Sequence, residues 1–183
     1  MSFVARQPVT AGAFWRLPDT GAPRELVRGQ VTELVPPGGR HGAIAAVVAT
    51  LLRSWAKRAG GGYVGVEAGY VLARGPDTVR APDVSYVRAD RIPSGGVPEG
   101  FWDLAPDLAV EIVSPGESAE QVREKVCDFL HAGTPLVWTL YPRTGQVIVH
   151  TPDGIARTCG REEMLEFGEL LPGFRCTVAE LFE

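Results

Sequence analysis

The sequence has little of the chemistry that marks several large classes of protein. Its three cysteines are odd in number and form no Cys-x-x-Cys pair, so neither a disulfide framework nor a zinc knuckle is indicated. The longest apolar run, Ala43 to Leu52, is far shorter than the roughly 20 residues of a membrane span. The N-terminus lacks the basic start and apolar core of a signal peptide. We therefore expect a cytoplasmic protein with no membrane association.

Neither sign of charge is in large excess. The formal net charge of -4 gives no general attraction to nucleic acid, so any such binding has to come from a local basic patch. The Gly60 to Gly62 run lacks the Lys-Ser/Thr of a phosphate-binding loop. The 22 glycines and 15 prolines lie between patterned segments and show no repeat. We expect residues 1–22 to form an N-terminal extension and residues 23–183 to form one globular domain.

Hydrophobic periodicity predicts an α/β (α+β) core with a mixed sheet flanked by helices. In the first half we expect, in order, a hairpin over Glu25–Val35, a helix over Arg40–Ala59, antiparallel strands over Tyr63–Ala73 and Val79–Arg88, and a loop over Arg91–Trp102. In the second half we expect a strand over Leu108–Val113, a helix opening at Ser118, a central strand over Pro135–Tyr141, C-terminal hairpin strands over Gln146–His150 and Ile155–Thr158, and a short helix after Thr177.

A glutamate interrupts the most apolar of the predicted strands. Side chains alternate along a strand, so Glu111 shares its face with Ala109 and Val113. In the helix that follows, Lys125 lies about 60 degrees from Val122 and about 40 degrees from Phe129 on the helical wheel, and so points with the apolar stripe. The sequence therefore predicts that Lys125 faces Glu111, because either charge would be costly to bury alone.

A second carboxylate enters the preceding strand directly after a proline. If the strands of Asp83 and Glu111 are neighbours, their carboxylates can converge on one hard cation, and Mg²⁺ suits oxygen ligands of this kind. Lys125 beside them could orient water and stabilise charge on a phosphoryl group. The three residues together are typical of metal-assisted phosphodiester hydrolysis.

Each of these residues also has a structural interpretation when it is taken singly. A Pro-Asp pair often starts a strand, as Asp83 would here. A glutamate in an apolar strand, such as Glu111, is often a rim residue. A lysine beside an apolar stripe often extends to water, which would remove Lys125 from any site. Only their occurrence in consecutive elements favours chemistry.

The order of several short segments resembles the Uma-two family, a bacterial group placed in the PD-(D/E)xK nuclease superfamily. The segments that carry the resemblance are Arg24–Gly29, His41, Val79–Val84, Pro106–Pro115, Lys125, Ala132–Gly133, Val137–Trp138 and Leu171–Phe174. The resemblance implies a restriction-endonuclease-like core and an Mg²⁺- or Mn²⁺-dependent DNA endonuclease. It also implies that Asp83 and Glu111 bind the metal, with the backbone carbonyl of Ile112 as a further ligand.

The sequence departs from the superfamily pattern at one position. That pattern places a lysine two residues after the second acid, where this chain has Val113, so the resemblance implies that Lys125 has taken over the role. Glu67, Glu33 and His41 are additional candidates for the site.

Two questions stay open on the sequence alone. A homodimer would bring two sites to two DNA strands, with Phe14, Trp15 or the hairpin as contacts. The alternative function is a catalytically inactive nuclease fold that binds nucleic acid or acts in assembly.

Overall fold

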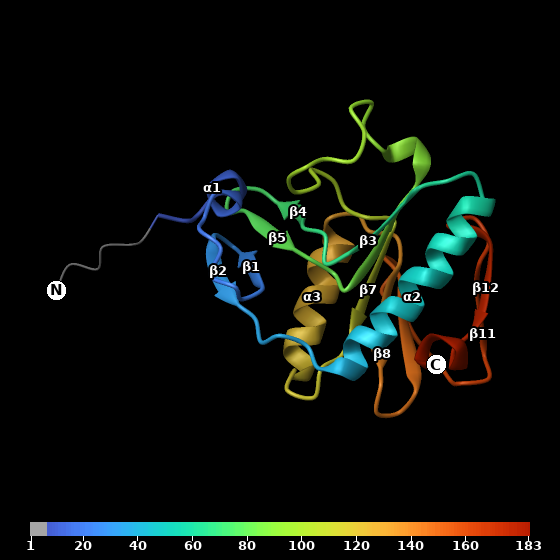
Figure 1. Cartoon of the computed structure of the whole chain (residues 1–183). Coiled ribbons are helices and arrows are strands. Elements are labelled where there is room, and N and C mark those ends of the chain that lie inside the picture. Colours follow the sequence, from blue (N-terminus) through green and yellow to red (C-terminus); the bar gives the residue numbers. More distant parts are fainter. Residues whose placement is uncertain (1–6) are drawn as a thin grey trace.

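The computed structural model describes residues 7–183, which form three β-sheets and three α-helices (Figure 1). The helices are α1 (Ala11–Trp15), α2 (Gly39–Arg58) and α3 (Ala119–His131), with two 3-10 turns, η1 (Ala89–Arg91) and η2 (Ala179–Phe182). None of the helices in this range is long and apolar enough to cross a membrane. The mixed sheets with flanking helices confirm the predicted fold class.

A six-stranded mixed sheet forms the centre of the molecule, in the order β10-β9-β8-β7-β6-β3. Its strands are β3 (Tyr63–Val66), β6 (Val84–Val87), β7 (Leu108–Ile112), β8 (Val137–Tyr141), β9 (Gln146–His150) and β10 (Ala156–Cys159). Only β7 and β8 are paired in parallel, and α3 is the crossover that such a pair requires. The expectation of a central strand at Pro135–Tyr141 is confirmed.

The two faces of β7 pack against different helices, as its alternating pattern predicts. Leu108, Val110 and Ile112 join the large core beneath α2, whereas Ala109 packs with Phe129 of α3 on the other face. Helix α3 lies between this sheet and the smaller four-stranded one (Figure 1). Glu111 therefore points into the layer that contains α3.

The second sheet has four strands in the order β2-β1-β5-β4. They are β1 (Arg24–Val27), β2 (Gln30–Glu33), β4 (Tyr70–Ala73) and β5 (Thr78–Arg80). The predicted hairpin at Arg28-Gly29 is confirmed, and positive φ angles of 48° and 77° at these two residues suit a tight two-residue turn.

The strand predicted over Tyr63–Ala73 is two strands, and so is the one predicted over Val79–Arg88. In each case the chain leaves one sheet and enters the other, bending at Glu67 and at the segment 81–83. Period-2 alternation can continue through such a bend, so side-chain pattern alone does not reveal it. The bend places Glu67 beside Asp83, whose carbonyl accepts the Glu67 amide at 3.3 Å.

Part of the segment before residue 23 is ordered against the four-stranded sheet. Helix α1 is capped by Thr10, and its Ala11 amide donates to the Asp77 carboxylate at 2.8 Å. Phe14 is buried in a cluster with Leu26. This part of the expected N-terminal extension therefore packs against the domain, and Phe14, named above as a candidate dimer contact, is buried. Residues 1–6 lie outside the described part of the chain.

A C-terminal hairpin that periodicity did not reveal closes the large core. It consists of β11 (Met164–Phe167) and β12 (Leu171–Thr177), and its Phe174 packs edge-on against Trp55 of α2. The Trp55 indole donates to the Pro172 carbonyl at 2.9 Å. The predicted terminal helix is present as the 3-10 turn η2.

One buried charge network ties the four-stranded sheet to α3. Arg80 of β5 lies 2.7 Å from the Glu25 carboxylate of β1 and 2.7 Å from the Asp128 carboxylate of α3. Arg80 is 5% exposed and Glu25 is 2% exposed. Water therefore cannot take the place of either group in the ion pair between them. This network fixes the hairpin side of the molecule relative to the layer that contains Glu111.

Removing the arginine should leave two carboxylates without their cation. We expect Arg80→Ala to lower the free energy of unfolding by about 3 to 5 kcal/mol, because a broken buried pair leaves uncompensated charge. Urea denaturation measures the change. The matched control is Arg157→Ala, which removes an exposed ion pair with Glu163 and should leave stability nearly unchanged, because exposed ion pairs contribute little. Equal effects of the two changes would contradict the assigned role of the network.

Candidate active site

A groove of about 920 Å³ opens between the hairpin β1–β2, the start of α2 and the start of α3. Its floor is formed where β7 ends and where the chain enters β6. Asp83, Ile112 and Lys125 all line it. These predicted site residues thus belong to one surface depression of the protein, whereas Glu111 is buried next to Ile112 and does not line it.

Glu111 and Lys125 face each other across the interface of strand and helix, as predicted. The Lys125 Nζ lies 3.1 Å from Oε2 of Glu111, and the two side chains are 18% and 7% exposed. The helix that delivers the lysine begins as expected, with a capping box in which Ser118 and Gln121 bond to each other's backbone amides. Val122, Val126 and Phe129 are buried, which turns Lys125 toward the sheet.

Asp83 lies at the end of the neighbouring strand, beside Glu111. The paired register of β6 and β7 ends at Val84 and Val110, so Asp83 and Glu111 are the next residues on the two strands. The Asp83 Oδ2 accepts the backbone N–H of Ile112 at 2.6 Å. This bond holds the Asp83 carboxylate against the end of β7.

The carboxylate of Glu111 is not fully satisfied by its neighbours. Burial raises the pKa of Glu111 above its usual range, the Lys125 ammonium opposes that rise, and the charge of Asp83 adds to it. Its Oε1 is buried and has no hydrogen-bond partner among residues 7–183. A buried acceptor without a partner is unfavourable, so this oxygen is suited to an added cation or donor.

A second carboxylate, which the sequence did not single out, also holds Lys125. Oε1 of Glu117 lies 2.9 Å from the Lys125 Nζ, and Oε2 accepts the Ser114 amide at 2.9 Å. Burial alone would lower the pKa of Lys125, but the carboxylates of Glu111 and Glu117 raise it above its usual range. The available sequence signal was the Ser-x-x-Glu spacing of Ser114 and Glu117.

His41, a predicted additional residue, lies in the site. Its Nε2 is 3.2 Å from Oδ2 of Asp83. The hydrogen bond to Asp83 raises the pKa of His41, and the backbone carbonyl of Ile112 raises it further. The Ile112 carbonyl, predicted as a metal ligand, therefore lies beside this imidazole.

The other two additional candidates line the groove from different sides. Glu67 is exposed at the bend between β3 and β4, with a φ of 51° that is unusual for a residue with a side chain. Glu33 is exposed at the end of β2, opposite Arg24 in the hairpin register. Glu67 is thus the nearer candidate in the fold, because its amide bonds directly to Asp83.

The residues present fit a divalent cation held by few protein ligands. Among residues 7–183 no group of three or more His, Cys, Asp or Glu side chains is arranged to hold a metal. Mg²⁺ needs no such cage, since one or two carboxylates and substrate phosphates commonly suffice. The unpartnered Oε1 of Glu111, beside Asp83, is compatible with that mode of binding.

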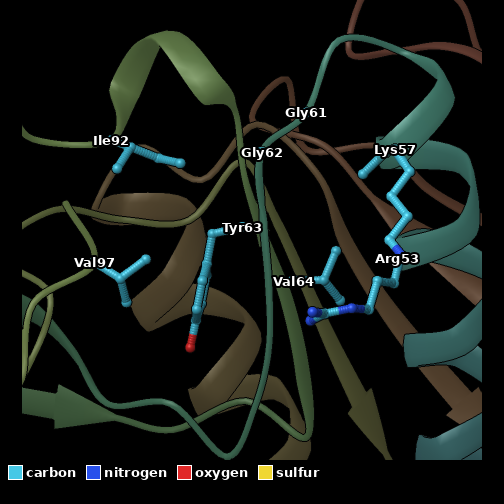
Figure 2. Close-up of a pocket in the computed structure, with 9 residues that line it drawn as sticks. Arg53, Lys57, Gly61, Gly62, Tyr63, Val64, Ile92 and Val97 are labelled. Carbon is cyan, nitrogen blue, oxygen red and sulfur yellow. The ribbon is translucent and has the colours of Figure 1, made fainter.

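A smaller hollow of about 240 Å³ lies at the far end of α2. Figure 2 shows Tyr63 and Val64 pointing to opposite sides of β3, with Arg53 and Lys57 on the Val64 side. No carboxylate or histidine lines it. The chemistry that the sequence predicts therefore belongs to the larger groove.

Comparison with known proteins identifies the family and the fold of the chain. The profile of the Uma2 family, described as "Putative restriction endonuclease", matches residues 12–179. A crystal structure described as "a putative nuclease belonging to DUF820", from Anabaena variabilis, covers 96% of this chain and 98% of its own, with a TM-score of 0.84 and 24% identity, and so shares the fold. No curated protein matches. Because the profile spans nearly the whole sequence, the chain belongs to the Uma2 restriction endonuclease family.

Proposed function

We propose that this protein is a metal-dependent DNA endonuclease that hydrolyses phosphodiester bonds in the groove between the hairpin and α3. The observation that carries the proposal is the buried Glu111 carboxylate, with one unpartnered oxygen, between Asp83 and Lys125. The family of the chain supports a nucleic acid as substrate. The net charge of -4 means that the binding force has to be local.

Asp83 and Glu111 are the residues that would hold Mg²⁺ or Mn²⁺, with the Ile112 carbonyl as a further oxygen at the same strand end. When bound, the ion would supply Lewis-acid polarisation of the phosphate and lower the pKa of water. The Ile112 amide keeps the Asp83 carboxylate oriented toward the groove floor. A carboxylate that is already oriented loses less freedom on binding, which favours affinity.

Lys125 supplies the positive charge that the chemistry needs. Its ammonium is held beside Glu111 and stays protonated, since the surrounding carboxylates raise its pKa. It can donate to a phosphate oxygen and stabilise the charge that develops there. His41, whose Nε2–H donates to the Asp83 carboxylate, is available to move a proton at the edge of the groove.

The three central residues should be needed for cleavage. We expect Asp83→Asn, Glu111→Gln and Lys125→Met each to lower the rate of Mg²⁺-dependent plasmid cleavage by at least about 100-fold. Glu120→Gln, an exposed change on the same helix, should leave the rate unchanged. Calorimetric titration with Mn²⁺ should show weaker binding only for the Asp83 and Glu111 variants.

Other outcomes of this experiment are equally informative. Cleavage that persists in the Asp83 and Glu111 variants would rule out the proposed site. DNA binding by the wild-type protein without any cleavage would favour the non-catalytic alternative, a nuclease fold that binds nucleic acid or acts in assembly.

Glu67 is proposed as a further carboxylate of the site because its backbone is strained there. Glu67→Gly should raise the free energy of unfolding by about 1 kcal/mol, since glycine adopts positive φ without strain. The same change should slow cleavage, and Glu67→Gln should slow it without the gain in stability. Urea denaturation and plasmid cleavage are the measurements, and full activity in both variants would exclude Glu67 from the site.

We also propose that the protein acts as a homodimer, so that two sites reach two strands. Trp15 is 55% exposed and Val35 is 90% exposed on the side of the four-stranded sheet, which gives apolar surface for such a contact. Sedimentation velocity should give twice the chain mass of 19.6 kDa, and Trp15→Ala should shift the protein toward the monomer. A wild-type protein that is monomeric at the concentrations that support cleavage would contradict the proposal.

A further inference from the structure

We infer that Glu117 is a positioning residue that sets the place of the Lys125 ammonium in the active site. This inference rests on the proposed nuclease function. Lys125 reaches the active site from helix α3, whereas Glu111 belongs to β7 of the central sheet. The lysine side chain has four flexible carbons, and a single ion pair leaves much of that freedom in place.

The contacts of Glu117 divide between the lysine and the end of β7. Its Oε1 lies 2.9 Å from the Lys125 Nζ, and its Oε2 accepts the Ser114 amide at 2.9 Å. The Glu117 amide in turn donates to the Ser114 carbonyl at 3.1 Å, closing the turn. Val113, just before this turn, is bonded through its amide to Leu140 of β8. The carboxylate that holds the lysine is therefore itself fixed to the central sheet.

The ion pair with Glu117 changes where the Lys125 ammonium can lie. With Glu111 as its sole partner, the ammonium would move fully onto the carboxylate that is proposed to bind the cation. Shared between Glu111 and Glu117, it is held beside that carboxylate. Burial works to raise the pKa of Glu117, but the Ser114 amide and the Lys125 ammonium lower it below its usual range. Glu117 thus remains an anion that can hold the lysine.

Two substitutions separate this role from that of a simple turn cap. Glu117→Gln keeps an oxygen that can accept the Ser114 amide, but it replaces the oxygen facing Lys125 by an amide group that donates. Glu117→Ala removes both contacts. A residue that only closes the turn would tolerate glutamine, whereas a positioning residue would not.

Steady-state cleavage of a DNA oligonucleotide duplex in Mg²⁺ is the first measurement. We expect both variants to lower kcat by about 10- to 100-fold with KM little changed, because a misplaced group weakens the transition state more than substrate binding. Wild-type kcat in Glu117→Gln would overturn the inference, even if Glu117→Ala were inactive. Glu120→Gln, an exposed change in the first turn of α3, is the matched control.

The second measurement needs no activity. An ammonium held in two ion pairs exchanges its protons slowly enough for its ¹H–¹⁵N signal to be recorded, and Lys125→Met assigns that signal. We expect it in the wild-type protein and expect its loss in Glu117→Gln, with the backbone spectrum otherwise preserved. A signal that survives in Glu117→Gln, or that is missing from the wild type, overturns the inference. A wild-type protein that fails to cleave DNA but gives the expected spectra would contradict the proposed function and leave the anchoring role supported.

Discussion

The burial of one carboxylate in the central sheet is the constraint on which the rest of the site depends. Every residue of β7 is buried, so Glu111 cannot reach water by a small movement of its side chain. An isolated buried carboxylate would destabilise the fold by several kcal/mol. Lys125, from the helix α3 that links β7 to β8, supplies the compensating positive charge. The buried Glu111 carboxylate thereby specifies how α3 packs on the sheet.

A second buried cluster of charged side chains lies next to the Glu111–Lys125 pair. Glu25, Arg80 and Asp128 connect the hairpin sheet to α3 directly beside Lys125, and the charge of Glu25 acts on the pKa of both Glu111 and Lys125. The hairpin that forms one wall of the groove is thus fixed by the same charges that form its floor. Apolar contacts join the two sheets as well, since Tyr70 of β4 and Val87 of β6 pack in one buried cluster with Trp102.

The sequence predicted this site to the extent that it depends on local periodicity. Alternation along β7 and the helical wheel of α3 placed Glu111 and Lys125 on facing surfaces, because both depend only on backbone geometry. Glu117 was missed because the Ser-x-x-Glu spacing points only to its bond with the Ser114 amide, whereas its ion pair with Lys125 depends on the path of the turn before α3. The bends at Glu67 and Asp83 were missed because strand pairing, and not side-chain pattern, decides which sheet a strand joins.

The position of the lysine has a consequence for how the site can be changed. A lysine at the place of Val113 would share a strand and a face with Glu111, so strand geometry alone would set their separation. A lysine on α3 is placed by the packing of that helix on the sheet, where Phe129 and Val126 are buried against Ala109. Protein cores are close-packed and transmit small changes of volume. The apolar packing beneath α3 therefore sets the position of the Lys125 backbone. The turn closed by Glu117 sets the position of the Lys125 ammonium.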